Sequence, residues 1–151
     1  MTDTRQKVLA QIGELLDSQR LAVLSTHKGN QPYSSLVAFS ASFDSTYIYL
    51  LTPSTTRKYE NLTANPKVSI LVNDSRNRPD DIYNAVSVTG TGVAEVIEKS
   101  ENMDMLNRYL KKHPQLKEFS NAPTSAFIRI TIKRYFMVMR FQNVVEVKVT
   151  P

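Results

Sequence analysis

The chain has 151 residues and a mass of 17.1 kDa, which is enough for one globular domain and too little for two ordinary ones. Its 41% hydrophobic and 22% charged content excludes a mainly disordered, collagen-like or membrane-embedded chain. The absence of Cys excludes disulfides, thiolate metal sites and a cysteine nucleophile. The formal net charge of +5 fits either a polyanion or a small phosphorylated ligand.

The first 18 residues carry the pattern of an amphipathic helix that ends near Ser18. Acidic residues interrupt its apolar positions, so it lacks the uninterrupted apolar run of a secretory signal, and no stretch of the chain approaches the roughly 18 apolar residues of a membrane span. We therefore expect a cytoplasmic protein with no membrane association. The apolar positions recur at spacings of three and four: Val8, Leu9, Ile12, Leu15 and Leu16.

From Leu21 the pattern changes to strands, separated by turns. A meander of three strands (21–26, 33–40 and 47–52) should have one turn that contains His27 and a second at residues 42–46. A short helix should follow, capped by a hydroxyl among residues 54–56 and stopped by Pro66.

The second half of the chain should also consist of strands and a helix. We expect a strand over 67–73 and a long strand over 85–97, in which Gly90 and Gly92 indicate a bulge or bend. Ser100 should cap a helix that ends at Pro114. Residues 125–149 are dense in β-branched and aromatic residues and should form two or three strands.

These elements predict a mainly β protein with flanking helices. Six to eight antiparallel strands in meander order favour a closed or split β-barrel, because a parallel sheet needs a helix after nearly every strand. No repeat or linker divides the chain, so we expect a single domain over 1–151. Its parts would be an N-terminal helix (1–19), a barrel core (20–99), a helical insertion (100–120) and closing strands (125–150).

Most standard catalytic patterns are missing from the sequence. His27 and His113 have no neighbouring ligand pair, so we expect no metal site and a structural or exposed role for both. There is no GxSxG or Walker A motif, and Glu95 stands where a dinucleotide fingerprint needs its third glycine.

The basic residues are scattered along the chain and are expected to lie on the solvated surface. Lys111 and Lys112 are among them, and this pair also suits the negative end of its own helix. Four methionines are expected to fill the core: Met103, Met105, Met137 and Met139.

One segment, LTPSTTRKYENL at residues 51–62, combines features that suit a phosphate group. Its hydroxyl residues run into Arg57 and Lys58 where a strand ends and a helix begins. Free N–H groups at a helix start, hydroxyl donors and two adjacent cations form a complete phosphate cradle. The alternative is an ordinary capped helix with two exposed cations.

Residues 31–72 resemble the FMN-binding split-barrel family of the pyridoxamine 5′-phosphate oxidase type. The resemblance lies in QPYSSLVAFS and YIYLLTPSTTRKYENLTANPKVSILV, which reproduce the family's order of strand, strand ending in Thr, hydroxyl-Arg-Lys, short helix, Asn-Pro and strand. It implies an FMN-binding split barrel that forms a homodimer with the cofactor between its subunits. It also implies an oxidoreductase that exchanges electrons with a small-molecule donor or acceptor.

The resemblance also implies roles for individual residues. Thr56, Arg57 and Lys58 would hold the FMN phosphate, and Thr52 would lie beside the cofactor at the end of its strand. The second strand would lie with its backbone against the flavin ring and ribityl chain. The implied cofactor-binding residues are Ser35, Leu36, Val37, Ala38, Thr52, Thr56, Arg57 and Lys58. No catalytic side chain is assigned, because a flavin carries the reactive atoms itself.

Two departures from the family's pattern narrow this reading. Where the oxidases place Arg in an Arg-x-Val pattern, this chain has Ser35-Leu36-Val37, which removes one phosphate partner. The tail, RFQNVVEVKVTP, lacks the oxidases' Trp and their Arg-Leu-His-Asp-Arg run. We therefore expect a flavin reductase and not a pyridoxamine phosphate oxidase. The polar candidates left in the tail for a substrate or cofactor contact are Arg129, Arg140 and Asn143.

Three alternatives remain open at this point. A deazaflavin coenzyme would suit the basic loop at Arg76 and Arg78, and a non-enzymatic haem or flavin carrier would need a histidine ligand for haem. A small RNA-binding barrel is the third, although we do not expect nucleic acid as the partner, because strand alternation should bury about half of the aromatic residues that could stack on bases. Those aromatic residues are Tyr33, Phe39, Tyr47 and Tyr49.

Overall fold

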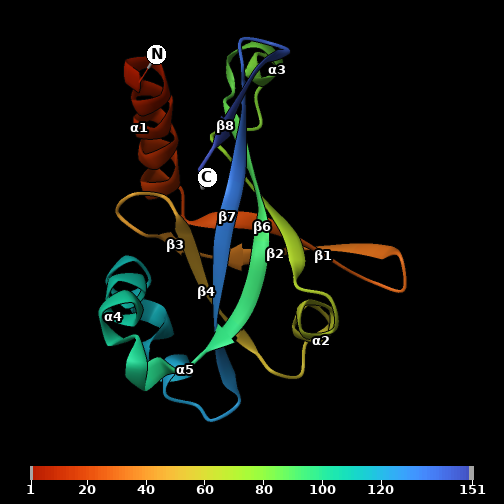
Figure 1. Cartoon of the computed structure of the whole chain (residues 1–151), viewed down its shortest axis with the longest axis vertical. Helices are drawn as coiled ribbons and strands as arrows, with labels where there is room; N and C mark the ends of the chain where they lie inside the picture. Colours follow the sequence, from red (N-terminus) through yellow and green to blue (C-terminus); the bar gives the residue numbers. More distant parts are fainter. Residues whose placement is uncertain (1, 150–151) are drawn as a thin grey trace.

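The computed structural model describes the backbone of residues 2–149 and the side chains of residues 4–149. Met1, Thr150 and Pro151, at the ends of the expected domain, lie outside the described residues, and the division of the chain into four parts stays a prediction. The described residues form eight antiparallel strands in one curled sheet with helices around it, as expected for a split barrel (Figure 1). The strands are β1 (Leu21–Lys28), β2 (Gln31–Ala38), β3 (Ser40–Ala41), β4 (Tyr47–Pro53), β5 (Lys67–Asn73), β6 (Ser87–Ile97), β7 (Ser125–Met139) and β8 (Asn143–Lys148).

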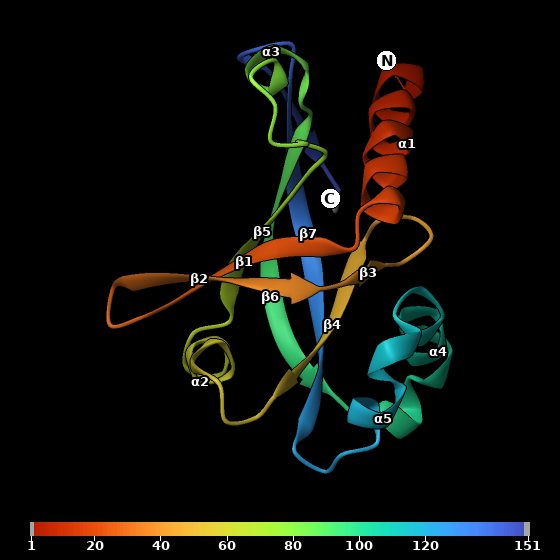
Figure 2. The ribbon, with the colours of Figure 1, turned by 180° about the vertical axis from the view of Figure 1, so that it is seen from behind.

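Helices lie around the sheet, one before the first strand and the others in the connections between strands. The α-helices are α1 (Thr2–Ser18), α2 (Arg57–Ala64), α3 (Asp81–Asn84), α4 (Met103–Lys112) and α5 (Lys117–Ser120), with 3₁₀ turns at Lys99–Glu101 and Pro114–Leu116. Figures 1 and 2 place α2 on one side of the barrel and α4 with α5 on the other.

The sheet curls almost into a closed barrel because its two edge strands are consecutive in the chain. The strand order is β2-β1-β5-β6-β7-β4-β3, and β8 adds a further pairing to β7. Only Phe39, which is fully buried, separates β2 from β3. The chain therefore continues from one edge of the sheet to the other.

The bend of the barrel occurs where the sequence predicted a bulge. The register between β6 and β7 shifts at Thr91 and Gly92. A Cβ atom on Gly92 would lie 2.0 Å from the backbone oxygen of Thr131, so only glycine allows the two strands to approach this closely.

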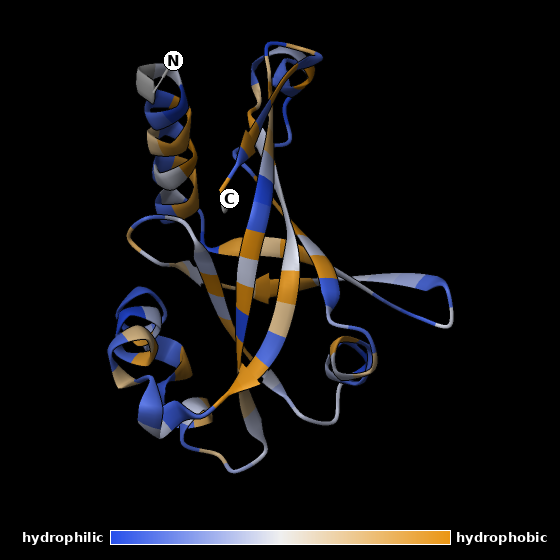
Figure 3. Cartoon of the chain, in the orientation of Figure 1, coloured by the Kyte–Doolittle hydropathy of each residue, from blue (hydrophilic) through white to orange (hydrophobic). Residues whose placement is uncertain are grey.

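Two hydrophobic clusters stabilise the fold. The larger fills the barrel and includes Ile12 and Leu16 of α1, and Figure 3 shows the corresponding apolar positions on the inward side of that helix. The smaller lies outside β4 and β7, where Tyr49 and Phe127 pack against Tyr109 of α4. β4 is therefore buried on both faces, as its continuous apolar sequence suggests.

Several local predictions were wrong. His27 lies in β1 and not in a turn, because the turn forms at Gly29 and Asn30, which have positive φ. Ser100 lies inside a 3₁₀ turn, and α4 begins three residues later. Met103 is 46% exposed at the first position of that helix, so it does not fill the core.

Candidate functional site

The predicted phosphate cradle lies at the junction of β4 and α2. Thr52 is buried at the end of β4, and Thr56 caps α2 by accepting a hydrogen bond from the N–H of Tyr59 at 3.3 Å. The hydroxyls of Thr52 and Thr56 are 2.9 Å apart, and each also lies within hydrogen-bond distance of the carbonyl of Pro53, at 3.2 and 3.0 Å. These contacts hold the turn in place, so the free N–H groups of the first helical turn keep one direction.

Two cations stand beside this turn, as predicted. The Arg57 guanidinium lies 5.6 Å from the ring centre of Tyr33 on β2, which joins α2 to the second strand. Lys58 is half-buried, and its burial lowers the pKa of the ammonium group. A bound anion would offset that loss of hydration.

The predicted residues of β2 divide between its two faces. Ser35 and Val37 pair with Leu24 and Ala22 of β1 and face inward, whereas Leu36 faces outward and is 63% exposed. Ala38, on the same face as Leu36, is partly buried against the smaller cluster. The structure thus places Tyr33, the neighbour of Arg57, on the same face as Ser35.

Ser35 has an unusual environment for a serine. Its Oγ is buried and has no hydrogen-bond partner among the described residues. A buried hydroxyl without a partner costs about 1–3 kcal/mol of stability.

A pocket of about 320 Å³ adjoins the cradle and contains residues that the sequence did not indicate. Lys28 contacts Glu60 across it, and this contact is the main cause that lowers the pKa of the Glu60 carboxyl group. The two residues are 32 positions apart, so no local motif could have joined them. The pocket is lined by Lys28, Gln31, Pro32, Tyr33, Arg57, Glu60 and Asn61.

The three polar candidates of the tail do not gather at the cradle. Arg129 forms an ion pair with Glu95 at 2.6 Å and lies over the ring of Tyr47 at 5.2 Å. Arg140 occupies the turn before β8, with a positive φ of 48°, and Asn143 begins that strand.

Arg76 and Arg78 also lie elsewhere. Their backbone N–H groups donate to the carboxylate of Asp81 at 3.0 Å, which orders the loop before α3. Figures 1 and 2 place α3 at the opposite end of the molecule from α2. Within this chain the basic loop therefore cannot extend the cradle.

The two histidines have different environments. His113 is buried at the end of α4, with Nε2 2.7 Å from the carbonyl oxygen of Phe39, which is a structural role. His27 is partly buried beside an open pocket on β1. The described residues contain no cluster of three or more His, Asp or Glu side chains that could hold a metal ion. No helix among them is long and apolar enough to cross a bilayer.

Of the four aromatic residues considered as stacking platforms, Phe39 and Tyr49 are buried. Tyr33 is 38% exposed and Tyr47 is intermediate. The expectation that about half of them pack inside is confirmed, and the two buried rings cannot stack on bases.

Similar folds occur among solved structures. A heme binding protein from Mycobacterium smegmatis matches with a TM-score of 0.81 at 17% identity, over 93% of this chain and 58% of the other. An FAD-binding protein from Mesorhizobium loti matches with a TM-score of 0.67 at 23% identity, over 85% and 91%. Campylobacter jejuni ChuZ matches with a TM-score of 0.79 at 15% identity, over 95% and 60%.

Comparison with curated protein sequences found no match. The family model described as pyridoxamine 5′-phosphate oxidase matches residues 8–139, which include every strand from β1 to β7 and the cradle at α2. The chain therefore belongs to the pyridoxamine 5′-phosphate oxidase family.

Proposed function

We propose that this protein binds FMN at the junction of β4 and α2 and acts as a flavin-dependent oxidoreductase. The observation that carries the proposal is the prearranged turn at Thr52 and Thr56, with Arg57 and Lys58 in the first turn of the helix that follows. Family membership and a similar fold in an FAD-binding protein support it.

The residues present fit a cofactor that carries a phosphate. Arg57 and Lys58 supply two positive charges, and the first turn of α2 supplies backbone N–H donors. The orphan hydroxyl of Ser35 faces the same side of β2 as Tyr33, the contact of Arg57. This hydroxyl is buried and uncharged, so it does not replace the missing arginine.

The residues of the site would bind and orient the cofactor and would not react themselves. Thr52 and Thr56 hold the turn, and Lys58 offers its charge from a partly dehydrated position. Bound FMN would supply hydride and electron transfer through its own ring system.

A homodimer would complete this site. The outer face of β1 and β2 carries Leu21 and Leu36, which are 52% and 63% exposed on neighbouring strands. Val23 of β1 pairs with Leu36 on one side and with Leu71 of β5 on the other, which extends the apolar face. A face of this kind favours burial against a second copy.

FMN titration of the purified protein tests the proposal. We expect the protein to retain a flavin whose absorption band lies at about 450 nm, as it does for other bound flavins. The double variant Arg57→Ala/Lys58→Ala should bind FMN about a hundredfold more weakly, because two charged hydrogen bonds are lost. The charge-matched control Lys7→Ala/Lys117→Ala alters exposed residues of α1 and α5 and should bind as the wild type does. A protein that takes up no FMN would overturn the proposal.

Haem is a second candidate, because one similar structure is described as a heme binding protein. His113 is held by the Phe39 carbonyl, so His27 beside its pocket of about 470 Å³ is the histidine placed to meet a ligand. Haem addition should then give a Soret band that His27→Ala abolishes. A Soret band without flavin uptake would replace FMN by haem, whereas flavin uptake alone would exclude this candidate.

A further inference from the structure

A second basic cavity lies on the other side of the barrel from α2. It has a volume of about 390 Å³ and lies where the end of α1, strand β3 and helix α4 meet. Figures 1 and 2 show α4 and α2 on opposite sides of the barrel, so this cavity is separate from the cradle. Its lining residues are Asp17, Ser40, Ala41, Arg108, Lys111 and Lys112.

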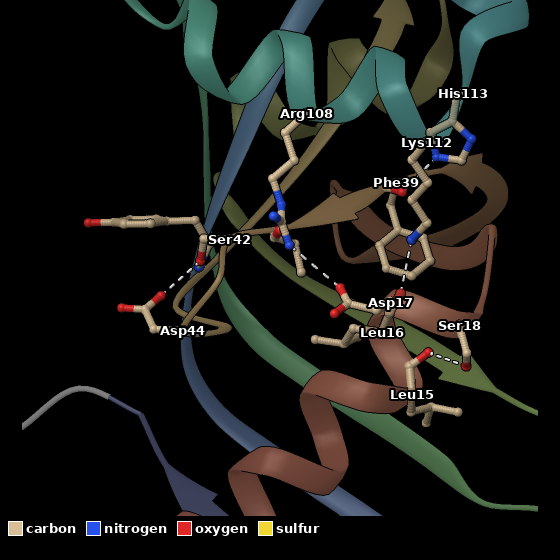
Figure 4. Close-up of polar contacts among 12 residues, drawn as sticks. Leu15, Leu16, Asp17, Ser18, Phe39, Ser42, Asp44, Arg108, Lys112 and His113 are labelled. Carbon is tan, nitrogen blue, oxygen red and sulfur yellow. Dashed lines mark hydrogen bonds and ion pairs between the residues drawn. The ribbon is translucent and has the colours of Figure 1, made fainter.

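Lys112 crosses from α4 to the end of α1. Its Nζ donates to the carbonyl oxygen of Leu16 at 2.9 Å and lies 4.0 Å from the ring centre of Phe39 (Figure 4). Burial lowers the pKa of Lys112 to about 8; nearby Asp17 raises it, while Arg108 and Arg20 lower it further. An ammonium group has three donors, so Lys112 keeps hydrogens for a ligand beyond the one given to Leu16.

Arg108 also has hydrogen-bond donors that the rest of the protein does not fully satisfy. Its Nε donates to the carbonyl oxygen of Ala41 at 2.7 Å, and one terminal nitrogen stands 3.7 Å from the carboxylate of Asp17. The long, largely exposed contact with Asp17 is weak, and other guanidinium N–H groups remain available. Figure 4 shows both long side chains descending from α4 toward the end of α1.

The charges of this cavity do not balance. Three cations, Arg108, Lys111 and Lys112, face one carboxylate, that of Asp17, which leaves an excess of two positive charges. Arg20 lies near enough to add to the same field. An excess of this size suits a dianion in contact with the cations.

Ser40 provides an independent observation. Ser40 lines the cavity, pairs with Tyr49 on the face of the sheet that packs against α4, and is 2% exposed. Its Oγ has no hydrogen-bond partner in the part of the chain that the structure describes. The Ser40 hydroxyl therefore has no acceptor, and it lies in the same cavity whose positive charges exceed its negative ones. A ligand oxygen in this cavity would satisfy both needs.

We propose that this cavity binds a small molecule that carries a phosphate monoester. A phosphate monoester is a dianion near neutral pH, which matches the two excess charges. The volume of about 390 Å³ exceeds that of an inorganic phosphate and falls within the range of small-ligand pockets. Arg108, Lys111 and Lys112 bind the phosphate oxygens, and Ser40 donates to one of them.

The test uses the Arg57→Ala/Lys58→Ala protein, so that the cradle at α2 contributes no phosphate binding. Calorimetric titration with inorganic phosphate and with glycerol 1-phosphate, at constant ionic strength, should show one site that prefers the ester. Lys111→Ala should weaken binding about tenfold, because one charged contact is lost from an exposed side chain that does not support the fold. Lys117→Ala, on exposed α5, is the matched control and should have no effect.

Two further variants separate binding from folding. Asp17→Asn should tighten phosphate binding by about threefold, because the competing carboxylate charge is removed. Ser40→Ala should weaken binding severalfold yet leave the thermal stability of the phosphate-free protein unchanged or higher, since the hydroxyl has no partner there.

A direct readout is the titration of the Lys112 ammonium group by NMR, in which phosphate should raise its pKa. Absence of phosphate binding in the Arg57→Ala/Lys58→Ala protein would overturn the proposal. Equal affinities in the Lys111→Ala and Lys117→Ala proteins would also overturn it. Acetate binding as tight as phosphate would overturn the assignment to a dianion.

Discussion

The hydroxyl groups of Thr52 and Thr56 lie 2.9 Å apart and join the end of β4 to the first turn of α2. The contact crosses the junction between a buried strand and a surface helix, so it sets the direction of the helix start relative to the barrel. Anchoring of this kind to a buried strand is what the proposed FMN site requires, because a cofactor has to be held in one orientation.

Removal of the helix cap should weaken both the fold and the cradle. Thr56→Ala loses the acceptor for the Tyr59 N–H, so the free energy of unfolding should fall by about 1 kcal/mol. FMN affinity should fall as well, because the turn loses the contact between the hydroxyls of Thr52 and Thr56. Urea denaturation and FMN titration measure the two effects. Thr55→Ala, at an exposed neighbour outside the cap, should change neither, and an equal loss in both variants would contradict the assignment of the cap.

The proposed dimer makes Leu36 a sensitive position. Leu36→Glu places a charge in the middle of the exposed apolar face and should convert the dimer into monomers, as light scattering would show. Phe43→Ser is the matched control, because Phe43 is 95% exposed in a turn outside this face. A wild-type protein that is monomeric at all concentrations would refute the dimer.

Gly92→Ala tests the bend of the barrel. The added Cβ would lie 2.0 Å from the Thr131 oxygen, so β6 and β7 must separate, and we expect a loss of more than about 3 kcal/mol or no folded protein. Gly13→Ala in α1 meets only the Ser45 hydroxyl at 3.4 Å and should stabilise the protein by about 0.5–1 kcal/mol. Thermal unfolding compares the two, and a harmless Gly92→Ala would show that the bulge can move.

His113 should make the fold sensitive to mild acid. Burial lowers the pKa of His113, the hydrogen bond to the Phe39 carbonyl raises it, and Lys112 and Arg20 lower it further. The folded state therefore binds fewer protons here than the unfolded state. The contribution of His113 is present above the unfolded pKa of 6.5 and is lost as the pH falls through the folded value.

The acid sensitivity is tested by measuring the free energy of unfolding between pH 7 and pH 5. The wild type is compared with His113→Gln. The wild type should lose stability more steeply over this range, because the glutamine does not titrate. Parallel curves would show that His113 keeps an ordinary pKa.

The order of strands and helices could be predicted because each element carries its own periodicity. Alternation along β5 and the three-and-four spacing of α1 are local properties, and both elements end within about two residues of the expected bounds. The placement of Thr52, Thr56, Arg57 and Lys58 at the junction of a strand and a helix was also predictable, since they lie within seven consecutive residues. Boundaries set by turns were less predictable, as His27 and Ser100 show.

Contacts between distant segments could not be predicted. The sequence suggested that Lys112 is a surface residue at the negative end of its own helix, but the structure places it half-buried against Leu16 of another helix, 96 positions away. The orphan hydroxyls of Ser35 and Ser40 are equally invisible in the sequence, because burial depends on what the rest of the chain lays over a strand.

The sequence by itself thus determined a mainly β barrel with a hydroxyl-capped helix after β4, because periodicity, capping and turn residues act over a few positions. Only the tertiary structure decided which charges stand together. It paired Lys28 with Glu60 beside the cradle and brought Arg108 and Lys112 to the end of α1. Electrostatic fields depend on distances in space, and the curl of the sheet sets those distances.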